Sequence, residues 1–109
     1  MKLRLQASEF VQSDLECIVR WYDSQEPGLS HRFMEAVEHA YGRIQHHPQM
    51  YVRIHGMARR ALVRPFPYMV VYRVRPRFIE VVGILPCRSD PDQVTRRLLR
   101  ATTPAGHTN

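Results

Sequence analysis

Arginine is the residue type with which this chain is best equipped to do chemistry. Residues 59–74, RRALVRPFPYMVVYRV, carry four arginines and no acidic residue. Side chains alternate along an extended strand, so Arg60, Leu62, Arg64 and Phe66 are expected on one face. At about 3.3 Å per residue, Arg60 and Arg64 lie about 13 Å apart. Arginine grips phosphate or carboxylate through two parallel hydrogen bonds, so the pattern predicts a face that binds an anionic partner.

Two further arginines can extend this face. Arg73 belongs to the next expected strand, and Arg88 follows the last one. The alternative is a solvated face on which arginines protect a sheet edge from pairing with another chain. Tyr68 and Tyr72 share one face of their strand, and for both we expect core packing.

Other chemistry finds little support in the sequence. His46, His47 and His55 have no carboxylate or thiolate at metal-binding spacing, so neither a metal nor a cofactor is predicted. Gly-rich phosphate loops, GxSxG motifs and Cys/His nucleophile arrangements are missing from the sequence. Cys17 and Cys87 lie seventy positions apart without a CxxC motif, which favours reduced thiols in the cytoplasm.

Charge is divided unevenly along the 109 residues. Residues 1–58 hold six Lys/Arg against seven Asp/Glu, whereas residues 59–109 hold ten against three.

The length predicts one domain, residues 1–100, followed by a flexible tail, 101–109. No apolar run reaches the 18 residues of a membrane span, and the first ten residues alternate where a signal peptide would be continuously apolar. We therefore expect a cytoplasmic protein without membrane contact.

Two amphipathic helices are expected to support the arginine-bearing strands. A short strand at 3–7 precedes Ser8, which can cap a helix. Two stripes of apolar residues then recur at spacings of four, three and four: Val11, Leu15, Ile18 and Tyr22, and Phe33, Val37, Ala40 and Ile44. The segment QEPGLS separates them, with Ser30 as the expected second cap. The stripes predict an antiparallel helical hairpin, because neither helix can bury its stripe alone.

Three strands are predicted after a loop around RIHGMA. They run from Arg59 to Phe66, Tyr68 to Val74 and Arg77 to Leu85, and their short turns favour an antiparallel meander. A short helix follows, capped by Asp90 or Ser89 with Pro91 in its first turn. The fold class is α+β, in the order β-α-α-β-β-β plus a short C-terminal helix. One sheet face takes the hairpin, and the other is expected to display the arginines.

The hairpin sequence, HGMARRALVRPFPYMVVYRV and the ending CRSDPDQV together resemble the RelE/ParE superfamily of bacterial type II toxins over residues 3–98. The resemblance implies the same hairpin on an antiparallel sheet, and a cognate antitoxin as partner. It also implies one of two activities. RelE-like members cut messenger RNA on the ribosome without a metal, whereas ParE-like members poison DNA gyrase.

Departures from the RelE-like pattern favour the ParE-like activity. Arg60 and Arg88 match basic positions of RelE-like members, but Leu62 and Met69 stand where a lysine and an arginine are expected. After Arg88 the sequence has no Tyr, and the one His in that part of the sequence is His107. Metal-free RNA cleavage needs a base and an acid, which arginine cannot supply. We therefore predict a non-enzymatic, gyrase-binding toxin in a hetero-oligomer with its antitoxin.

The antitoxin is expected to lay an acidic, amphipathic segment along the basic face. The residues predicted to contact the antitoxin or the target are Arg60, Leu62, Arg64, Arg73 and Arg88. Two alternatives stay open. One is a RelE-like, metal-independent endoribonuclease with relocated catalytic groups such as His55 or Tyr72. The other is a degenerate, harmless relative that binds only its antitoxin.

Overall fold

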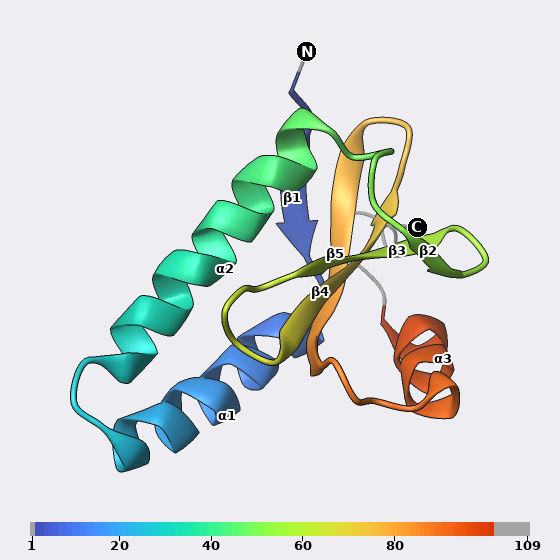
Figure 1. Cartoon of the computed structure of the whole chain (residues 1–109). Helices are drawn as coiled ribbons and strands as arrows, with labels where there is room; N and C mark the ends of the chain where they lie inside the picture. Colours follow the sequence, from blue (N-terminus) through green and yellow to red (C-terminus); the bar gives the residue numbers. More distant parts are fainter. Residues whose placement is uncertain (1, 102–109) are drawn as a thin grey trace.

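The computed structural model of the chain describes residues 2–101. Its three helices and five strands form an α+β fold (Figure 1). Helices α1 and α2 pack on one face of the sheet, and α3 packs on the other. In chain order the elements are β1 (Arg4–Ala7), α1 (Glu9–Gln25), α2 (Leu29–His46), β2 (Arg53–His55), β3 (Ala58–Leu62), β4 (Tyr68–Val74), β5 (Phe78–Pro86) and α3 (Pro91–Arg100). The predicted fold class is confirmed.

The helical hairpin packs through the two predicted stripes. Phe33, Val37, Ala40 and Ile44 of α2 are fully buried, and Val11, Ile18 and Tyr22 of α1 are nearly so. They form one core with the hairpin-facing side chains of the sheet, including Tyr72. Tyr22, Phe33, Phe66 and Tyr68 meet as an aromatic group with ring centroids 5.2–6.3 Å apart. The spacing of apolar residues thus located the main core correctly.

The sheet has the order β1-β5-β4-β3-β2, and it is mixed where an antiparallel sheet was predicted. β1 lies at one edge and pairs with β5 in parallel, with Arg4 opposite Phe78 and Ala7 opposite Val81. The remaining pairs are antiparallel, as the meander predicts. The two helices and the first strands of the meander form the long connection that a parallel pair requires. No tight turn joins β1 to its partner β5, so local turn signals could not predict this pairing.

The predicted strand from Arg59 to Phe66 is shorter, because β3 ends at Leu62. Pro65 and Pro67 follow, and neither has the N–H group that a sheet ladder uses. Phe66 therefore leaves the face of Arg60 and packs in the hairpin-side core. The predicted loop around RIHGMA instead contains β2, which joins β3 through a two-residue turn. Gly56 has a φ of 56° in that turn, a conformation that glycine adopts without strain.

Caps set the helix boundaries. The Ser8 hydroxyl accepts a hydrogen bond from Phe10 N, and Asp90 forms a capping box with Gln93, with Pro91 at the first position of α3. Both caps were expected. The predicted cap at Ser30 is wrong, because α2 begins at Leu29 behind Gly28, whose φ is 84°. Ser30 instead donates a hydrogen bond to the Asp23 carboxylate.

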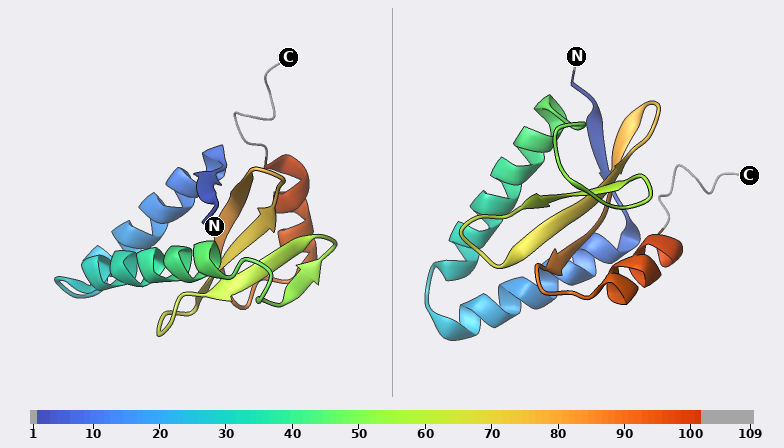
Figure 2. Two further views of the ribbon diagram at one scale, coloured as in Figure 1. Left: turned by 90° about the horizontal axis from the view of Figure 1, so that it is seen from above. Right: turned by 45° about the vertical axis from the view of Figure 1, so that its right-hand side comes forward.

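The helix α3 covers part of the sheet face opposite the hairpin (Figure 2). Val94, Leu98 and Ala101 pack there on Met69, Val71 and Val82, which makes a second, smaller core. The face predicted to be open is therefore open only beyond α3, toward β3 and β2. Ala101 is buried, and residues 102–109 of the predicted flexible tail lie outside the described residues.

Candidate functional site

Three of the predicted site residues meet in one groove. Arg60, Leu62 and Arg64 line a cavity of about 410 Å³ together with Arg43, Met50, Tyr51 and Val52. We call this the β3 groove. Arg60 and Leu62 lie on the face opposite the hairpin, since the residues beside them, Ala61 and Val63, are buried in the hairpin-side core. Met50 and Val52 are 63% and 62% exposed, so the groove offers both apolar surface and guanidinium groups.

Two arginines outside the predicted set shape the wall of the β3 groove. Arg43 Nη2 donates to the Leu62 carbonyl at 2.9 Å, which ties α2 to the end of β3. Arg59 Nη1 donates to the Tyr51 carbonyl at 2.7 Å, and its Nη2 donates to Gln49 Oε1 at 2.9 Å. These bonds hold the segment after α2 in place beside β3. The apolar part of the groove is thereby fixed by side chains from α2, from β3 and from the segment between α2 and β2.

Arg73 is separated from the other predicted site residues. Its guanidinium makes two hydrogen bonds of 3.0 Å to Glu80, a carboxylate that is 2% exposed and lies opposite it on β5. It also donates to the carbonyls of Leu98 and Ala101 at 3.4 Å, at the C-terminal end of α3. Arg75 contacts the same carboxylate. The Arg73 guanidinium is thus engaged within the protein, where it fixes α3 to the sheet.

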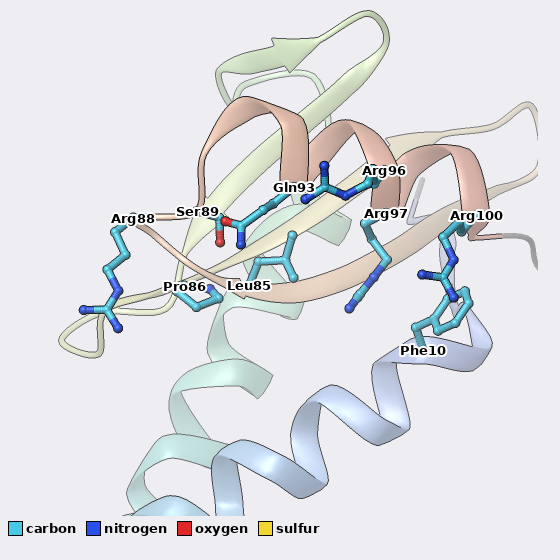
Figure 3. Close-up of a pocket in the computed structure, with 9 residues that line it drawn as sticks. All are labelled: Phe10, Leu85, Pro86, Arg88, Ser89, Gln93, Arg96, Arg97 and Arg100. Atoms are coloured by element: carbon cyan, nitrogen blue, oxygen red, sulfur yellow. The ribbon is translucent and has the colours of Figure 1, made fainter.

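Arg88 also lies away from the β3 groove. It is exposed after β5 and lines two adjoining cavities, which are drawn in part in Figure 3. The first, of about 540 Å³, we call the α3 cleft; its lining residues are Phe10, Leu85, Pro86, Arg88, Ser89, Gln93, Arg96, Arg97 and Arg100. The second, of about 470 Å³, we call the Trp21 hollow; it is lined by Trp21, Tyr22, Pro67, Tyr68, Pro86, Cys87 and Arg88.

The α3 cleft rests on an ion pair that sequence reasoning missed. Arg97 binds Asp14 of α1 through both oxygens, at 2.6 and 2.9 Å, and Asp14 Oδ2 also accepts from Ile84 N at 3.0 Å. A Cβ atom at Gly83 would overlap Arg97 Nη1, so glycine leaves the space that this guanidinium fills. Arg96 and Arg97 each lie about one turn before Arg100, which was a signal for a basic helix face.

His55 and Tyr72, the two groups suggested for proton transfer, differ in burial: Tyr72 is buried and His55 is exposed. Tyr72 is fully buried on the hairpin side, and its hydroxyl donates to the Pro48 carbonyl at 2.7 Å. Burial raises the pKa of Tyr72 to about 12, against a smaller opposing effect of Arg59. It therefore cannot face a substrate held by Arg60. His55 is exposed and lines a cavity of about 180 Å³ that it shares with Arg60, Met69, Cys87 and Ser89, which we call the His55 cavity.

Metal binding finds no geometric support within the described residues. No group of three His, Cys, Asp or Glu side chains in residues 2–101 is placed to hold an ion. His107, the single histidine after Arg88, lies outside that range. Both cysteines are free thiols, and no helix of the described chain is long and apolar enough to cross a membrane.

Comparison with known proteins agrees with the fold. A solved structure, described as the chromosomal ParDE toxin-antitoxin system from P. aeruginosa, superposes with a TM-score of 0.70 at 17% sequence identity, covering 78% of this chain and 96% of that one. No curated protein sequence matches. The sequence model of the ParE toxin family, from type II parDE toxin-antitoxin systems, matches residues 5–91. With its hairpin, its sheet and most of its length matched, the chain belongs to the ParE toxin family of type II toxin-antitoxin systems.

Proposed function

We propose that this chain inhibits growth by binding DNA gyrase, and that a cognate antitoxin neutralises it in the cytoplasm by forming a hetero-oligomer with it. The observation that carries this proposal is the β3 groove, where Arg60 and Arg64 stand beside apolar side chains and the lining residues include no histidine or carboxylate. Such a surface suits binding, and Tyr51 is the one lining side chain besides the arginines that carries an exchangeable proton. Family membership supports gyrase as the target, since ParE-like toxins poison that enzyme.

The antitoxin segment that fits the β3 groove is short, acidic and amphipathic. Its carboxylates would pair with Arg60 and Arg64, while its apolar residues cover Met50, Val52 and Leu62. A flexible segment of this kind folds as it binds. The charge of the second half of the chain, ten Lys/Arg against three Asp/Glu, favours capture of such a partner.

Gyrase inhibition is tested with the purified chain. We expect it to block negative supercoiling of a relaxed plasmid by gyrase, and addition of the antitoxin to restore the reaction. Messenger RNA on translating ribosomes should remain intact in a parallel toeprinting assay. Supercoiling at the normal rate in the presence of excess toxin would overturn the proposal for this target.

One observation favours a RelE-like ribonuclease as the second candidate. His55 and Arg60 line the same His55 cavity, so a base or acid and a phosphate-binding cation border one space. New 3′ ends in the ribosomal A site, lost in the His55→Ala variant and kept in His46→Ala, would establish this activity. Intact messenger RNA with both variants and with the unmodified chain would exclude it.

The third alternative is a harmless relative that binds only its antitoxin. Induced expression of the chain distinguishes it from an active toxin. Growth arrest on induction, relieved by the antitoxin gene, supports an active toxin. Undiminished growth at a confirmed level of folded protein would favour the harmless relative.

A further inference from the structure

The α3 cleft and the Trp21 hollow form one continuous surface outside the β3 groove. They share Arg88 and Pro86, and neither shares a lining residue with the β3 groove. Figure 3 shows Arg88 at one end of the α3 cleft and Arg100 at the other, above the α1 residue Phe10. The surface is therefore distinct from the β3 groove in its lining residues.

The α3 cleft carries an excess of uncompensated positive charge. Of its four arginines, Arg97 is paired with Asp14, whereas Arg88, Arg96 and Arg100 form no ion pair with any side chain of residues 2–101. The cleft lining contains no acidic residue. A ligand with several negative charges would meet three guanidiniums that have no carboxylate partner in the described chain.

The arginines of α3 are held in position by the fold. Arg96 and Arg100 are one turn apart, about 6 Å along the helix axis. Arg97 and Arg100 lie over the Phe10 ring, with guanidinium carbons 5.3 and 5.5 Å from its centroid. The opposite side of the helix is fixed by Val94 and Leu98 on the sheet. The pair Arg96 and Arg100, at this spacing, matches two successive phosphates along one extended strand.

The Trp21 hollow adds an aromatic surface beside this row. Trp21 is the chain's single tryptophan and is 56% exposed. The half-buried Tyr68 and the rings of Pro67 and Pro86 complete the hollow. An exposed indole next to a free guanidinium gives an unpaired base a ring on which to stack while its phosphate is bound.

We propose that this surface binds single-stranded nucleic acid. Arg96 and Arg100 contact consecutive phosphates, Arg88 contacts a further phosphate of the same strand, and a base stacks on Trp21. An acidic peptide fits less well, because Arg97 and Arg100 cover the Phe10 ring, the one aromatic side chain in the lining of the α3 cleft. A duplex fits less well, because its paired bases cannot reach Trp21. The inference goes beyond the antitoxin and gyrase proposals and does not depend on them.

Trp21 itself reports binding. Titration of the purified chain with the oligonucleotide dT12 should quench tryptophan fluorescence, since the base stacks on the only indole. The slope of log K against log salt concentration should be about −2, from about −0.7 for each of three phosphate contacts. Arg96→Gln or Arg88→Gln should lower affinity about fivefold at 0.1 M salt and reduce the slope by about 0.7.

Arg77→Gln is the matched control. Arg77 is exposed in the turn between β4 and β5 and lines neither cavity, so its loss removes the same charge at another place. This variant should retain affinity and quenching within about twofold. Anisotropy of labelled dT12 with Trp21→Phe should show weaker binding than with the unmodified chain, since phenylalanine offers a smaller stacking surface.

Three outcomes would overturn the proposal. Equal losses in Arg77→Gln and Arg96→Gln would show attraction to net charge alone. Equal affinity for a twelve-residue polyglutamate, with the same quenching, would assign the surface to acidic peptides. Equal affinity and quenching with a twelve-base-pair duplex would remove the role of an unpaired base.

Discussion

Asp14 joins three elements through one carboxylate. It accepts two hydrogen bonds from Arg97 of α3 and one from Ile84 N of β5, and it projects from α1. The side chains of Asp14 and Arg97 are 13% and 21% exposed, so water screens their attraction only in part. A carboxylate in such a place stabilises the fold by matching donors that would otherwise be left without a partner.

Replacing Asp14 with alanine should therefore be costly. We expect Asp14→Ala to lower the free energy of unfolding by about 2–3 kcal/mol, because it leaves Arg97 and the Ile84 amide without their acceptor. Glu16→Ala, on the exposed side of the same helix, should change it by less than about 0.5 kcal/mol. Urea unfolding followed by circular dichroism measures both. Equal effects of the two substitutions would contradict the role of Asp14.

Tyr72 makes the stability depend on alkaline pH. The pKa of a tyrosine in the unfolded chain is 10.0, and burial raises that of Tyr72 to about 12 in the folded protein. Between these values the unfolded chain releases the proton and the folded protein keeps it, so stability falls as pH rises. The expected slope from this one group reaches about −1.4 kcal/mol per pH unit. Below pH 10 its contribution is fully present.

The Tyr72→Phe variant tests whether Tyr72 causes this pH dependence of stability. The variant should be about 1 kcal/mol less stable at pH 8, since the hydrogen bond to Pro48 is lost. Between pH 10 and 12 it should lose stability less steeply than the unmodified chain, as the group that titrates has been removed. Tyr41, whose pKa is also raised to about 12 by burial, leaves a residual slope. Parallel curves for the two proteins would exclude Tyr72 as the source.

At the scale of elements, the position of α3 is set by β5. The β4–β5 register shifts between Val71, opposite Gly83, and Tyr72, opposite Val81, so Val82 has no partner in the ladder. Ser8 satisfies the backbone there, with its hydroxyl donating to the Val82 carbonyl at 3.0 Å. Gly83 then lies under Arg97, and α3 can approach the strand closely because glycine has no side chain.

Gly83→Ala should disturb this junction. The added methyl group overlaps the Arg97 guanidinium, which must leave Asp14, so we expect a loss of about 1–3 kcal/mol. Gly42→Ala is the matched control, because nothing lies within 4 Å of the added carbon in α2. In a helix interior, alanine should stabilise by about 0.5–1 kcal/mol. Opposite signs in thermal unfolding are the expected result, and equal signs would contradict the packing of Arg97 on Gly83.

For the whole molecule, the two basic surfaces have different surroundings. The β3 groove joins three arginines to the exposed apolar side chains of Met50 and Val52, whereas the α3 cleft holds four arginines among polar and apolar residues. Binding of an acidic antitoxin should therefore combine a salt-dependent part from Arg60 and Arg64 with a salt-independent part from Met50 and Val52.

Substitutions in the groove should separate these parts. Arg64→Gln is expected to weaken antitoxin binding about three- to tenfold at low salt and to lose most of its effect in 0.5 M salt, because exposed charges are screened there. Val52→Ser should weaken binding by a similar factor at every salt concentration. Arg77→Gln, outside the groove, serves as control. Titration calorimetry measures the antitoxin affinity of all three variants. A salt-dependent loss of affinity in Arg77→Gln would mean that net charge, and not the position of the arginine, controls binding.

The helices, their buried stripes and the meander were predictable from the sequence, because period, caps and turn residues are local properties. The common location of Arg60, Leu62 and Arg64 was predictable as well. The remaining features depend on tertiary packing. Arg73 and Arg88 look alike in sequence, yet Arg73 faces the buried Glu80 and Arg88 faces solvent. The parallel pairing of β1 and the contact between Asp14 and Arg97 join positions more than seventy residues apart. Such long-range pairing follows from how the layers pack, which local pattern does not specify.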